Sequence, residues 1–396
     1  MKKPMTQTVS WVGKVDWDLL RFHGDEYSTH KGSSYNSYVI EEEKTVLIDT
    51  VWKPYAKEFV DNLEAEGILG RLDAVIAQHA ESDHSGALPE LLNRRPDLPV
   101  YCSTNGIKSL KGHYHKDWNF KVVKTGDEYQ LGNGKKLVFI EAPMLHWPDS
   151  MFSYMTGDAI LFSNDAFGQH IATEKLYNDL VDQDELYDEA IKYYANILTP
   201  FSALVTAKIE QVLAFKLPVN LIATSHGVIW RDNPTQIVLK YLEWAKDYRE
   251  DRVTILYDTM WEGTRALADT LARAINDASP STTVVSHCLS KFDKNDALTD
   301  VFRSKALLLG SPTVGKGLLT AVAGMLEEIR GLAFKGKKAA AFGAYGWSGE
   351  AVKIISDSLA KSGFEIVDEG FRAMWNPDEN ALKAAYEYGK AFASKI

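Results

Sequence analysis

The chain has 396 residues, of which 45% are hydrophobic and 25% charged, and its formal net charge is −10. This length suits two domains, and the composition is that of an ordinary globular protein rather than a disordered or fibrous one. The negative charge and the absence of a long Lys/Arg run argue against nucleic acid or an anionic membrane as the main partner.

The lack of targeting signals and the small number of cysteines further restrict the class of protein. The sequence holds no run of about 18 apolar residues, and its first residues lack the apolar core of a signal peptide, so we expect a cytoplasmic protein without a membrane span. Its only cysteines, Cys102 and Cys288, lie far apart. They argue against a disulfide framework, a cysteine-rich zinc site and an iron–sulfur cluster held by this chain.

The first part of the chain mixes predicted strands and helices. Helical periodicity occurs at 54–68, 85–95, 184–198 and 234–250. Two short strand-like runs flank the turn "TGD" at 156–158, which predicts a hairpin.

From residue 251 the pattern becomes a regular alternation of strands and helices. The predicted strands are 253–257, 282–287, 306–310, 339–343 and 364–368. The predicted helices are 263–278, one from about 295, 317–330, 348–362 and one from about 378. Five strand–helix units predict an α/β domain with a doubly wound parallel sheet. We therefore expect one domain over 1–250 and a second over 251–396.

A dense group of ionisable residues follows the apolar run at 72–77. His79, Glu81, Asp83 and His84 lie within six positions. Burying such groups together is costly unless they are paired or bound to a metal. Since no helix or strand face calls for this combination, the group predicts a metal site.

Three more ligand-type residues, His146, Asp165 and His226, follow other predicted strands of the first part. Taken singly, His226 is more often a hydrogen-bonded loop residue and Asp165 a turn cap. Taken with the first group, they give enough ligands for two metal ions that share a carboxylate. The hard oxygen donor of Glu81 favours iron or manganese over zinc or copper. Five histidines outside these groups are expected to have structural roles: His30, His113, His115, His170 and His287.

The same motifs resemble a known family. "HAESDH" (79–84), "LHWPDS" with His146, "SNDAFGQ" with Asp165 and "SHG" with His226 are similar to the flavodiiron proteins. The resemblance implies an α/β two-domain fold: a metallo-β-lactamase-like αββα sandwich followed by a flavodoxin-like domain with a doubly wound parallel sheet. It extends over essentially the whole chain.

The resemblance also assigns roles to individual residues. It implies that His79, Glu81 and His146 hold one iron, that Asp83, His84 and His226 hold the other, and that Asp165 bridges them. In some members the histidine equivalent to His84 is turned away from the iron. His23 and Tyr194 match family positions beside the ligands and are the candidate catalytic residues.

The second domain is then expected to bind FMN at three strand ends. Thr259–Thr264 form a loop between a strand and a helix that can hold a phosphate, although a plain turn fits these residues equally well. The loop resembles that of flavodoxins, except that Glu262 stands where many of them have Gly. The candidate flavin-binding residues are Thr259, Met260, Trp261, Glu262, Gly263, Thr264, Ser311, Pro312, Thr313, Ala344, Tyr345, Gly346, Trp347 and Ser348.

A flavin and a two-iron site imply reduction of a small diatomic molecule. Several stretches resemble most closely the flavorubredoxin branch of the family, so we rank reduction of NO to N2O first and reduction of O2 to water second. That branch has a rubredoxin module with paired CxxC motifs, which this sequence lacks. The resemblance implies a separate rubredoxin or similar donor, or a sequence that is a piece of a longer chain. It also implies a head-to-tail homodimer or a dimer of dimers.

Two other classes of function remain open at this point. One is a zinc hydrolase of the metallo-β-lactamase type with an interaction module. The other is a flavodoxin-like electron carrier with a vestigial first domain. The sequence has no GxGxxG fingerprint, so direct binding of NAD(P)H is not indicated.

Overall fold

The computed structural model describes residues 2–396, which fold as two compact units. The first unit extends to Tyr193 and resumes over Phe201–Glu243, and the second consists of Tyr194–Pro200 and Trp244–Ile396. The boundary expected between residues 250 and 251 falls inside β17 (Glu250–Tyr257), the first strand of the second unit.

The first unit is built on two sheets. In spatial order, one sheet contains β1 (Lys3–Pro4), β2 (Val9–Trp11), β7 (Tyr38–Glu41), β8 (Thr45–Ile48), β9 (Leu72–Ile76), β10 (Val100–Cys102) and β11 (Phe120–Val122). The other contains β12 (Glu128–Gly132), β13 (Lys135–Glu141), β14 (Met151–Met155), β15 (Ile160–Asn164) and β16 (Leu221–Thr224). Two small ribbons pair β3 (Lys14–Asp16) with β6 (Ser33–Tyr35) and β4 (Arg21–Phe22) with β5 (Tyr27–Ser28).

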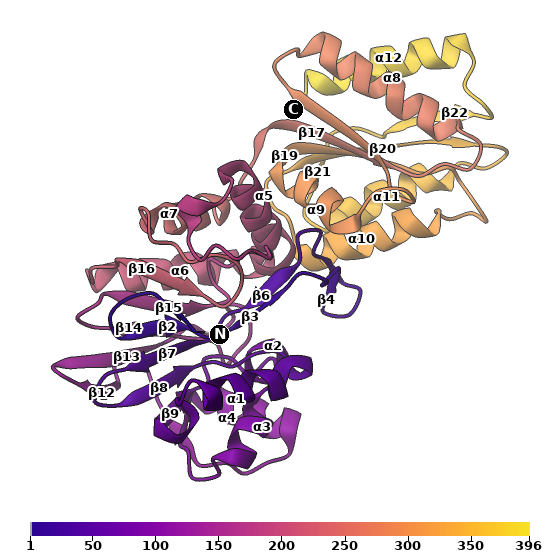
Figure 1. Ribbon diagram of the computed structural model, residues 1–396. Helices are drawn as coiled ribbons and strands as arrows, with labels where there is room; N and C mark the ends of the chain where they lie inside the picture. Colours follow the sequence, from indigo (N-terminus) through magenta and orange to yellow (C-terminus); the bar gives the residue numbers. More distant parts are fainter. Residues whose placement is uncertain (1) are drawn as a thin grey trace. The chain divides into compact units, whose positions relative to one another are not determined.

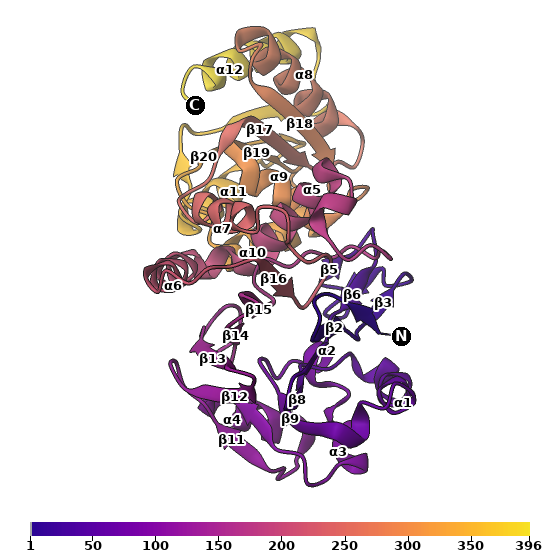
Figure 2. The same ribbon diagram turned by 60° about the vertical axis from the view of Figure 1, so that its left-hand side comes forward.

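Helices cover both sides of these sheets. Figures 1 and 2 show α1 (Ala56–Ala65), α3 (Leu88–Arg94) and α4 (Thr104–Tyr114) together on one side, and α6 (Ser202–Ala214) and α7 (Thr235–Trp244) on the other. The unit also contains α2 (Ser82–Ser85) and α5 (Gln183–Tyr193). Between the sheets, side chains such as Ile40, Ile76, Phe139 and Phe162 form one buried core. This is the predicted αββα sandwich.

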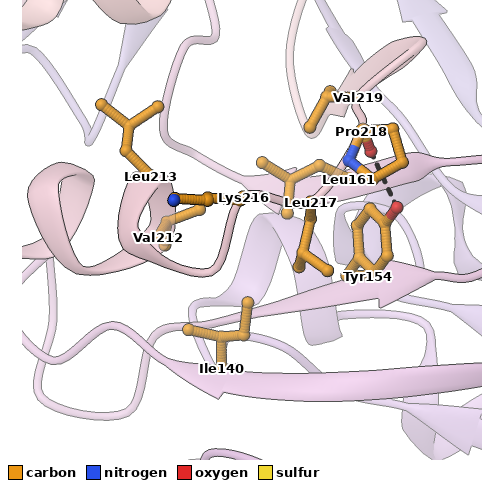
Figure 3. Close-up of a pocket in the computed structure, with 9 residues that line it drawn as sticks. All are labelled: Ile140, Tyr154, Leu161, Val212, Leu213, Lys216, Leu217, Pro218 and Val219. Carbon is orange, nitrogen blue, oxygen red and sulfur yellow. Dashed lines mark hydrogen bonds between the residues drawn. The ribbon is translucent and has the colours of Figure 1, made fainter.

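An apolar cavity of about 320 Å³ lies between α6 and the second sheet (Figure 3). Ile140, Leu161, Val212 and Leu217 are among its lining residues, and the hydroxyl of Tyr154 donates to the carbonyl of Pro218 at 2.7 Å. None of the predicted site residues lines it.

The second unit is a parallel sheet with helices on both faces. Its strands lie in the order β18 (Thr283–Cys288), β17, β19 (Ser304–Gly310), β20 (Lys338–Tyr345) and β21 (Glu365–Ile366), and β22 (Phe371–Met374) also pairs with β20. Figure 1 shows α8 (Gly263–Ala278) and α12 (Glu379–Ala393) on one face, and α9 (Lys294–Arg303), α10 (Thr320–Leu332) and α11 (Glu350–Lys361) on the other. Each of these strand pairs is parallel. A parallel sheet with helices on both faces is the predicted doubly wound arrangement.

The helical stretch Gln183–Ala214 reaches the length and apolar composition of a membrane-spanning helix. This criterion uses length and composition only, and the core helix of a soluble protein also meets it. The stretch is also not uniform, because the π-helical turn Tyr194–Leu198 separates α5 from the 3₁₀ turn Thr199–Phe201 and α6.

Candidate metal and flavin sites

The seven side chains predicted as metal ligands converge at one place in the first unit. They come from the loop after β9, from α2, from the loop between β13 and β14, and from the residues just after β15 and β16: His79, Glu81, Asp83, His84, His146, Asp165 and His226. Since β13 and β15 both pair antiparallel with β14, and β16 runs parallel to β15, the carboxyl ends of three strands meet at one edge. This topology explains why residues distant in sequence meet.

Asp165 stands at the centre of the group. Its Oδ2 lies 3.7 Å from Nε2 of His79 and 3.5 Å from Nε2 of His146. Its Oδ1 lies 3.0 Å from Nε2 of His84 and 3.4 Å from Nε2 of His226. The two oxygens of one carboxylate therefore face two different pairs of imidazoles.

Each pair of imidazoles has a carboxylate of its own. Oε2 of Glu81 lies 3.3 Å from Nε2 of His79 and 3.3 Å from Nε2 of His146.

The second pair is arranged in the same way. Oδ2 of Asp83 lies 3.1 Å from Nε2 of both His84 and His226. In each triplet the donor atoms lie within 4.8 Å of one another. The arrangement is two matched sites with a shared carboxylate, which is the geometry of a two-metal centre.

Several donor atoms have no hydrogen-bond partner among the described residues although they are buried. These atoms are both carboxylate oxygens of Asp83, both of Asp165, and Nε2 of His84. Leaving so many polar atoms unsatisfied in the interior is costly, and natural proteins rarely do so. Coordination of metal ions would satisfy Oδ2 of Asp83, both oxygens of Asp165 and Nε2 of His84, so the residues present fit a metal centre.

The pKa values of the carboxyl groups also support a metal centre. Burial alone would raise the pKa of Asp165, but the neighbouring His84 and His226 hold the pKa of this carboxyl well below its usual range. Burial likewise opposes ionisation of Glu81, and hydrogen bonds to His146, His23 and His79 lower the pKa of that carboxyl. The site therefore keeps Glu81 and Asp165 anionic, which suits the charge of metal ions.

Two further groups orient the imidazoles. Nδ1 of His79 lies 3.1 Å from Oδ2 of Asp149, and Nδ1 of His226 donates to the carbonyl of Ser34 at 2.6 Å. A partner on Nδ1 fixes the tautomer and leaves Nε2 available as a ligand. We did not predict either residue from the sequence. Asp149 lies in the same stretch as His146, whereas Ser34 is 192 positions from His226 and gave no sequence signal.

In the second unit, the loop before α8 has the features of a phosphate site. It leads into the N-terminus of a 16-residue helix. Oγ1 of Thr259 is buried without a hydrogen-bond partner among the described residues, and Thr264 is buried with its Oγ1 3.4 Å from the amide nitrogen of Ala344. A helix N-terminus beside an unsatisfied hydroxyl suits a phosphate group.

The other two predicted flavin loops lie beside each other at neighbouring strand ends. The amide of Thr313, after β19, donates to the carbonyl of Ala344 at 3.1 Å, and Oγ1 of Thr313 accepts from the amide of Ala351 at 3.2 Å. The side chains of Trp261 and Trp347 are 80% and 86% exposed. Apolar surface of this kind at the carboxyl edge of a doubly wound sheet fits a planar ligand such as an isoalloxazine ring.

Sequence comparisons agree with this architecture. Residues 34–227 match the model of the ODP family beta lactamase, and residues 255–389 match that of flavodoxin. The anaerobic nitric oxide reductase flavorubredoxin of Aliivibrio fischeri is 56% identical over 388 residues, which span 98% of this chain and 78% of that protein. This chain belongs to the flavodiiron protein family. A flavorubredoxin of Salmonella arizonae is 55% identical over 97% of this chain and 80% of its own length.

Solved flavodiiron proteins have the same fold. The rubredoxin oxygen:oxidoreductase of Desulfovibrio gigas superposes with a TM-score of 0.96 at 33% identity, covering 100% of this chain and 98% of that one. The flavodiiron protein of Giardia intestinalis superposes with a TM-score of 0.94 at 34% identity, covering 100% and 96%. The predicted family and fold class are confirmed.

The two candidate catalytic residues of this flavodiiron protein differ in their surroundings. Nε2 of His23 lies 3.0 Å from Oε1 of Glu81, so His23 borders the metal site. Tyr194 does not belong to the cluster: its ring packs 5.6 Å from that of Trp244 and 5.7 Å from that of Phe302, within the second unit.

The preceding residue, Tyr193, lies on the side of the metal site. Its ring is buried 5.4 Å from that of His170, which in turn lies 4.9 Å from that of His226. Burial and then the charge of Asp165 raise the pKa of Tyr193. Consecutive helical residues point in different directions, and α5 passes into the π-helical turn between Tyr193 and Tyr194. The structure thus places Tyr193, rather than Tyr194, among the residues that surround the cluster, and a catalytic role for Tyr194 stays a prediction.

The histidines expected to be structural include one that lies beside the cluster. Nδ1 of His170 is 2.7 Å from Oγ of Ser33, and the side chain is fully buried. In the second unit, Nε2 of His287 lies 2.9 Å from Oδ2 of Asp300.

Proposed function

We propose that this flavodiiron protein is a nitric oxide reductase that converts NO to N2O at a non-haem two-iron site, using electrons passed through FMN. The chain is an oxidoreductase, and FMN and two irons are its cofactors. Its 55–56% identity to proteins named anaerobic nitric oxide reductase flavorubredoxin supports NO as the substrate. The observation that carries the proposal is the Asp165 carboxylate, shared between two matched ligand sets.

The individual ligands are part of the proposal. His79, Glu81 and His146 are assigned to one iron, and Asp83, His84 and His226 to the other, with Asp165 as the bridge. The orientation of His84 supports its inclusion, because its Nε2 lies 3.1 Å from Asp83 and 3.0 Å from Asp165. When bound, the irons supply the redox chemistry that no side chain of the site has.

The reaction consumes protons and electrons, and this requirement determines what the side chains around the site have to do. Two NO molecules accept two electrons and two protons and yield one N2O and one water. Glu81, Asp83 and Asp165 offset the charge of the metal ions, and Asp149 and Ser34 hold two of the imidazoles in register. His23 is 30% exposed at its side chain and is in contact with Glu81, so we assign it a role at the border between solvent and the site.

The flavin site is assigned to the three strand-end loops of the second unit. Thr259 and the N-terminus of α8 would hold the phosphate, and the loops 311–313 and 344–348 would hold the rest of the cofactor. The unsatisfied hydroxyl of Thr259 supports this assignment. When bound there, FMN would supply one-electron transfer between a donor and the metal centre.

The electron donor, the assembly and the location of the protein complete the proposal. We propose a separate rubredoxin or similar protein as the electron donor, a head-to-tail homodimer or dimer of dimers as the assembly, and the cytoplasm as the location. The name of the solved Desulfovibrio gigas relative, rubredoxin oxygen:oxidoreductase, supports such a donor.

The same relative makes O2 reduction to water the second candidate function, since its name refers to oxygen and it is 33% identical to this chain. The zinc hydrolase and electron-carrier hypotheses are not retained, because the chain belongs to the flavodiiron family and has both ligand sets.

Steady-state turnover with each gas tests the proposal. The holoenzyme is assayed with one reduced rubredoxin at a fixed concentration, under NO without oxygen and then under O2 without NO. Faster consumption of NO, with N2O as the product, supports the first function. Consumption of O2 alone replaces it with the second.

A further inference from the structure

The segment Met374–Pro377, which follows β22, reaches two of the flavin loops. The strand register sets Ala373 opposite Ala344 and Met374 opposite Tyr345. The amide of Trp375 then donates to the carbonyl of Tyr345 at 2.6 Å. The segment is thereby fixed alongside the loop 344–348.

Its other end lies against the phosphate loop. A Cβ placed on Gly263 would be 3.4 Å from Oδ1 of Asn376 and 3.5 Å from Cδ of Pro377. Gly263 is the first residue of α8. The segment therefore spans from the proposed phosphate end of the flavin site to the loop that carries Trp347.

Trp375 has an unusual backbone conformation for a bulky residue. Its φ is +58°, in the left-handed region that side chains other than glycine rarely adopt. Strained conformations of this kind persist only where surrounding structure or function requires them. The ring nevertheless remains 60% exposed, and the adjacent Met374 is 53% exposed, so packing within the chain does not account for it.

The ring of Trp375 is held over the neighbouring loop. A Cβ on Gly346 would come within 3.0 Å of this ring, so the glycine lets the ring lie close to the backbone there without crowding. The ring centroids of Trp375 and Trp347 are 6.3 Å apart, and the ring planes are tilted by 51°. A planar ligand can stack between two aromatic rings only if their planes are parallel. Because the planes of Trp347 and Trp375 are tilted, these two rings can contact a ligand only from the same side.

We propose that Trp375 is a flavin-binding residue, which packs against the isoalloxazine ring and sets the position of Trp347 through its contact with Gly346. The inference rests on the proposed FMN site of the second unit. It explains why a strained tryptophan is exposed beside the exposed Trp347 at the carboxyl edge of the sheet. It also adds a residue from a strand end that none of the predicted flavin loops includes.

The test is titration of the FMN-free protein with FMN. The variant W375G removes the ring and suits the left-handed backbone, so its thermal midpoint should equal or exceed that of the parent. We expect its dissociation constant for FMN to rise at least tenfold. The fluorescence of the remaining bound flavin should increase, since a stacked indole quenches it. W375F, which keeps an aromatic ring, should stay within about threefold of the parent, and W375A provides a second ring-free variant.

Trp17 supplies the matched control, because it is 57% exposed and belongs to the first unit. W17A should bind FMN as the parent does. Equal FMN affinity and equal flavin fluorescence in the parent, W375G and W375A would overturn the assignment of Trp375 alone. Failure of the parent itself to bind FMN would overturn the proposed flavin site, and the assignment of Trp375 with it.

Discussion

Oδ2 of Asp149 lies 3.1 Å from Nδ1 of His79 and accepts a hydrogen bond from the amide of Ala80 at 2.7 Å. This carboxylate is buried, and it holds the His79 ring with Nε2 directed at Glu81 and Asp165. Asp149 thus acts on the metal site through one of its ligands. Partners of this kind tune ligand basicity and ring orientation.

D149N should weaken iron binding by roughly 10- to 100-fold, because the amide keeps the shape of the carboxylate but loses the charge that supports the imidazole. Iron per chain is measured after dialysis against a graded series of chelator concentrations. D97N is the control, since Asp97 is an exposed residue paired with Arg95. Identical iron retention in D149N and D97N would show that Asp149 has no part in metal binding.

Glu262 gives a prediction for the flavin site. Its φ is +62° at the N-cap of α8, and its side chain pairs with Arg265 at 3.3 Å on the surface. Glycine adopts this conformation without strain, and its lack of charge favours a phosphate at the helix N-terminus. E262G should therefore tighten FMN binding, by about 0.5–1 kcal/mol from the charge alone.

E262Q isolates the effect of the charge, because it removes the charge and keeps the side-chain size. Calorimetric titration of the FMN-free proteins should show that both variants bind FMN more tightly than the parent. Weaker FMN binding in E262G than in the parent would mean that the loop does not hold the phosphate.

Lys337 is a buried lysine with a structural role in the second unit. Its Nζ donates to the carbonyls of Phe302 at 2.6 Å, Ser304 at 2.7 Å and Tyr248 at 3.0 Å. K337M leaves these three acceptors unsatisfied, so we expect the free energy of unfolding of this unit to fall by about 3 kcal/mol or more. The urea concentration at which FMN is released reports this loss.

K335M is the comparison for this variant, because Lys335 is an exposed lysine two positions away. Its effect should stay within about 0.5 kcal/mol of the parent. If K337M and K335M release FMN at the same urea concentration, the three hydrogen bonds contribute nothing to stability.

The fold was predictable wherever the signal is local. The periodicity of residues 263–278 coincides with α8, and the hairpin expected around residues 156–158 is the antiparallel pair β14 and β15. Strand β22 escaped prediction because it has only four residues and is held by β20, about thirty positions earlier in the chain. Trp375 follows that strand, so it was missed with it.

The candidate site was predictable as residue types at strand ends, but not as a set of contacts. The spacing of His79, Glu81, Asp83 and His84 suffices to propose a metal site, and the structure brings them together with the three later residues. Whether each of them binds iron stays a prediction. The choice between Tyr193 and Tyr194 depends on where α5 becomes a π-helical turn, and no sequence pattern marks that point.

The two cysteines should differ in reactivity. Cys102 is fully buried in β10, and burial followed by the charge of Asp149 raises the pKa of its thiol to about 12. Cys288 is partly exposed. Because the thiolate is the reactive form, a thiol reagent at pH 8 should label Cys288 in the native protein and Cys102 only after unfolding, as peptide mass analysis can show. Rapid native labelling of Cys102 would contradict the buried position of β10.

The metal and flavin content of the purified protein, compared with that of D165A, tests the central claim most directly. We expect two irons and one FMN per parent chain. D165A should lose iron and keep FMN, because Asp165 belongs to the first unit and the flavin loops to the second. A colourless parent protein that contains zinc and no flavin, or a D165A variant that retains two irons, would contradict the account.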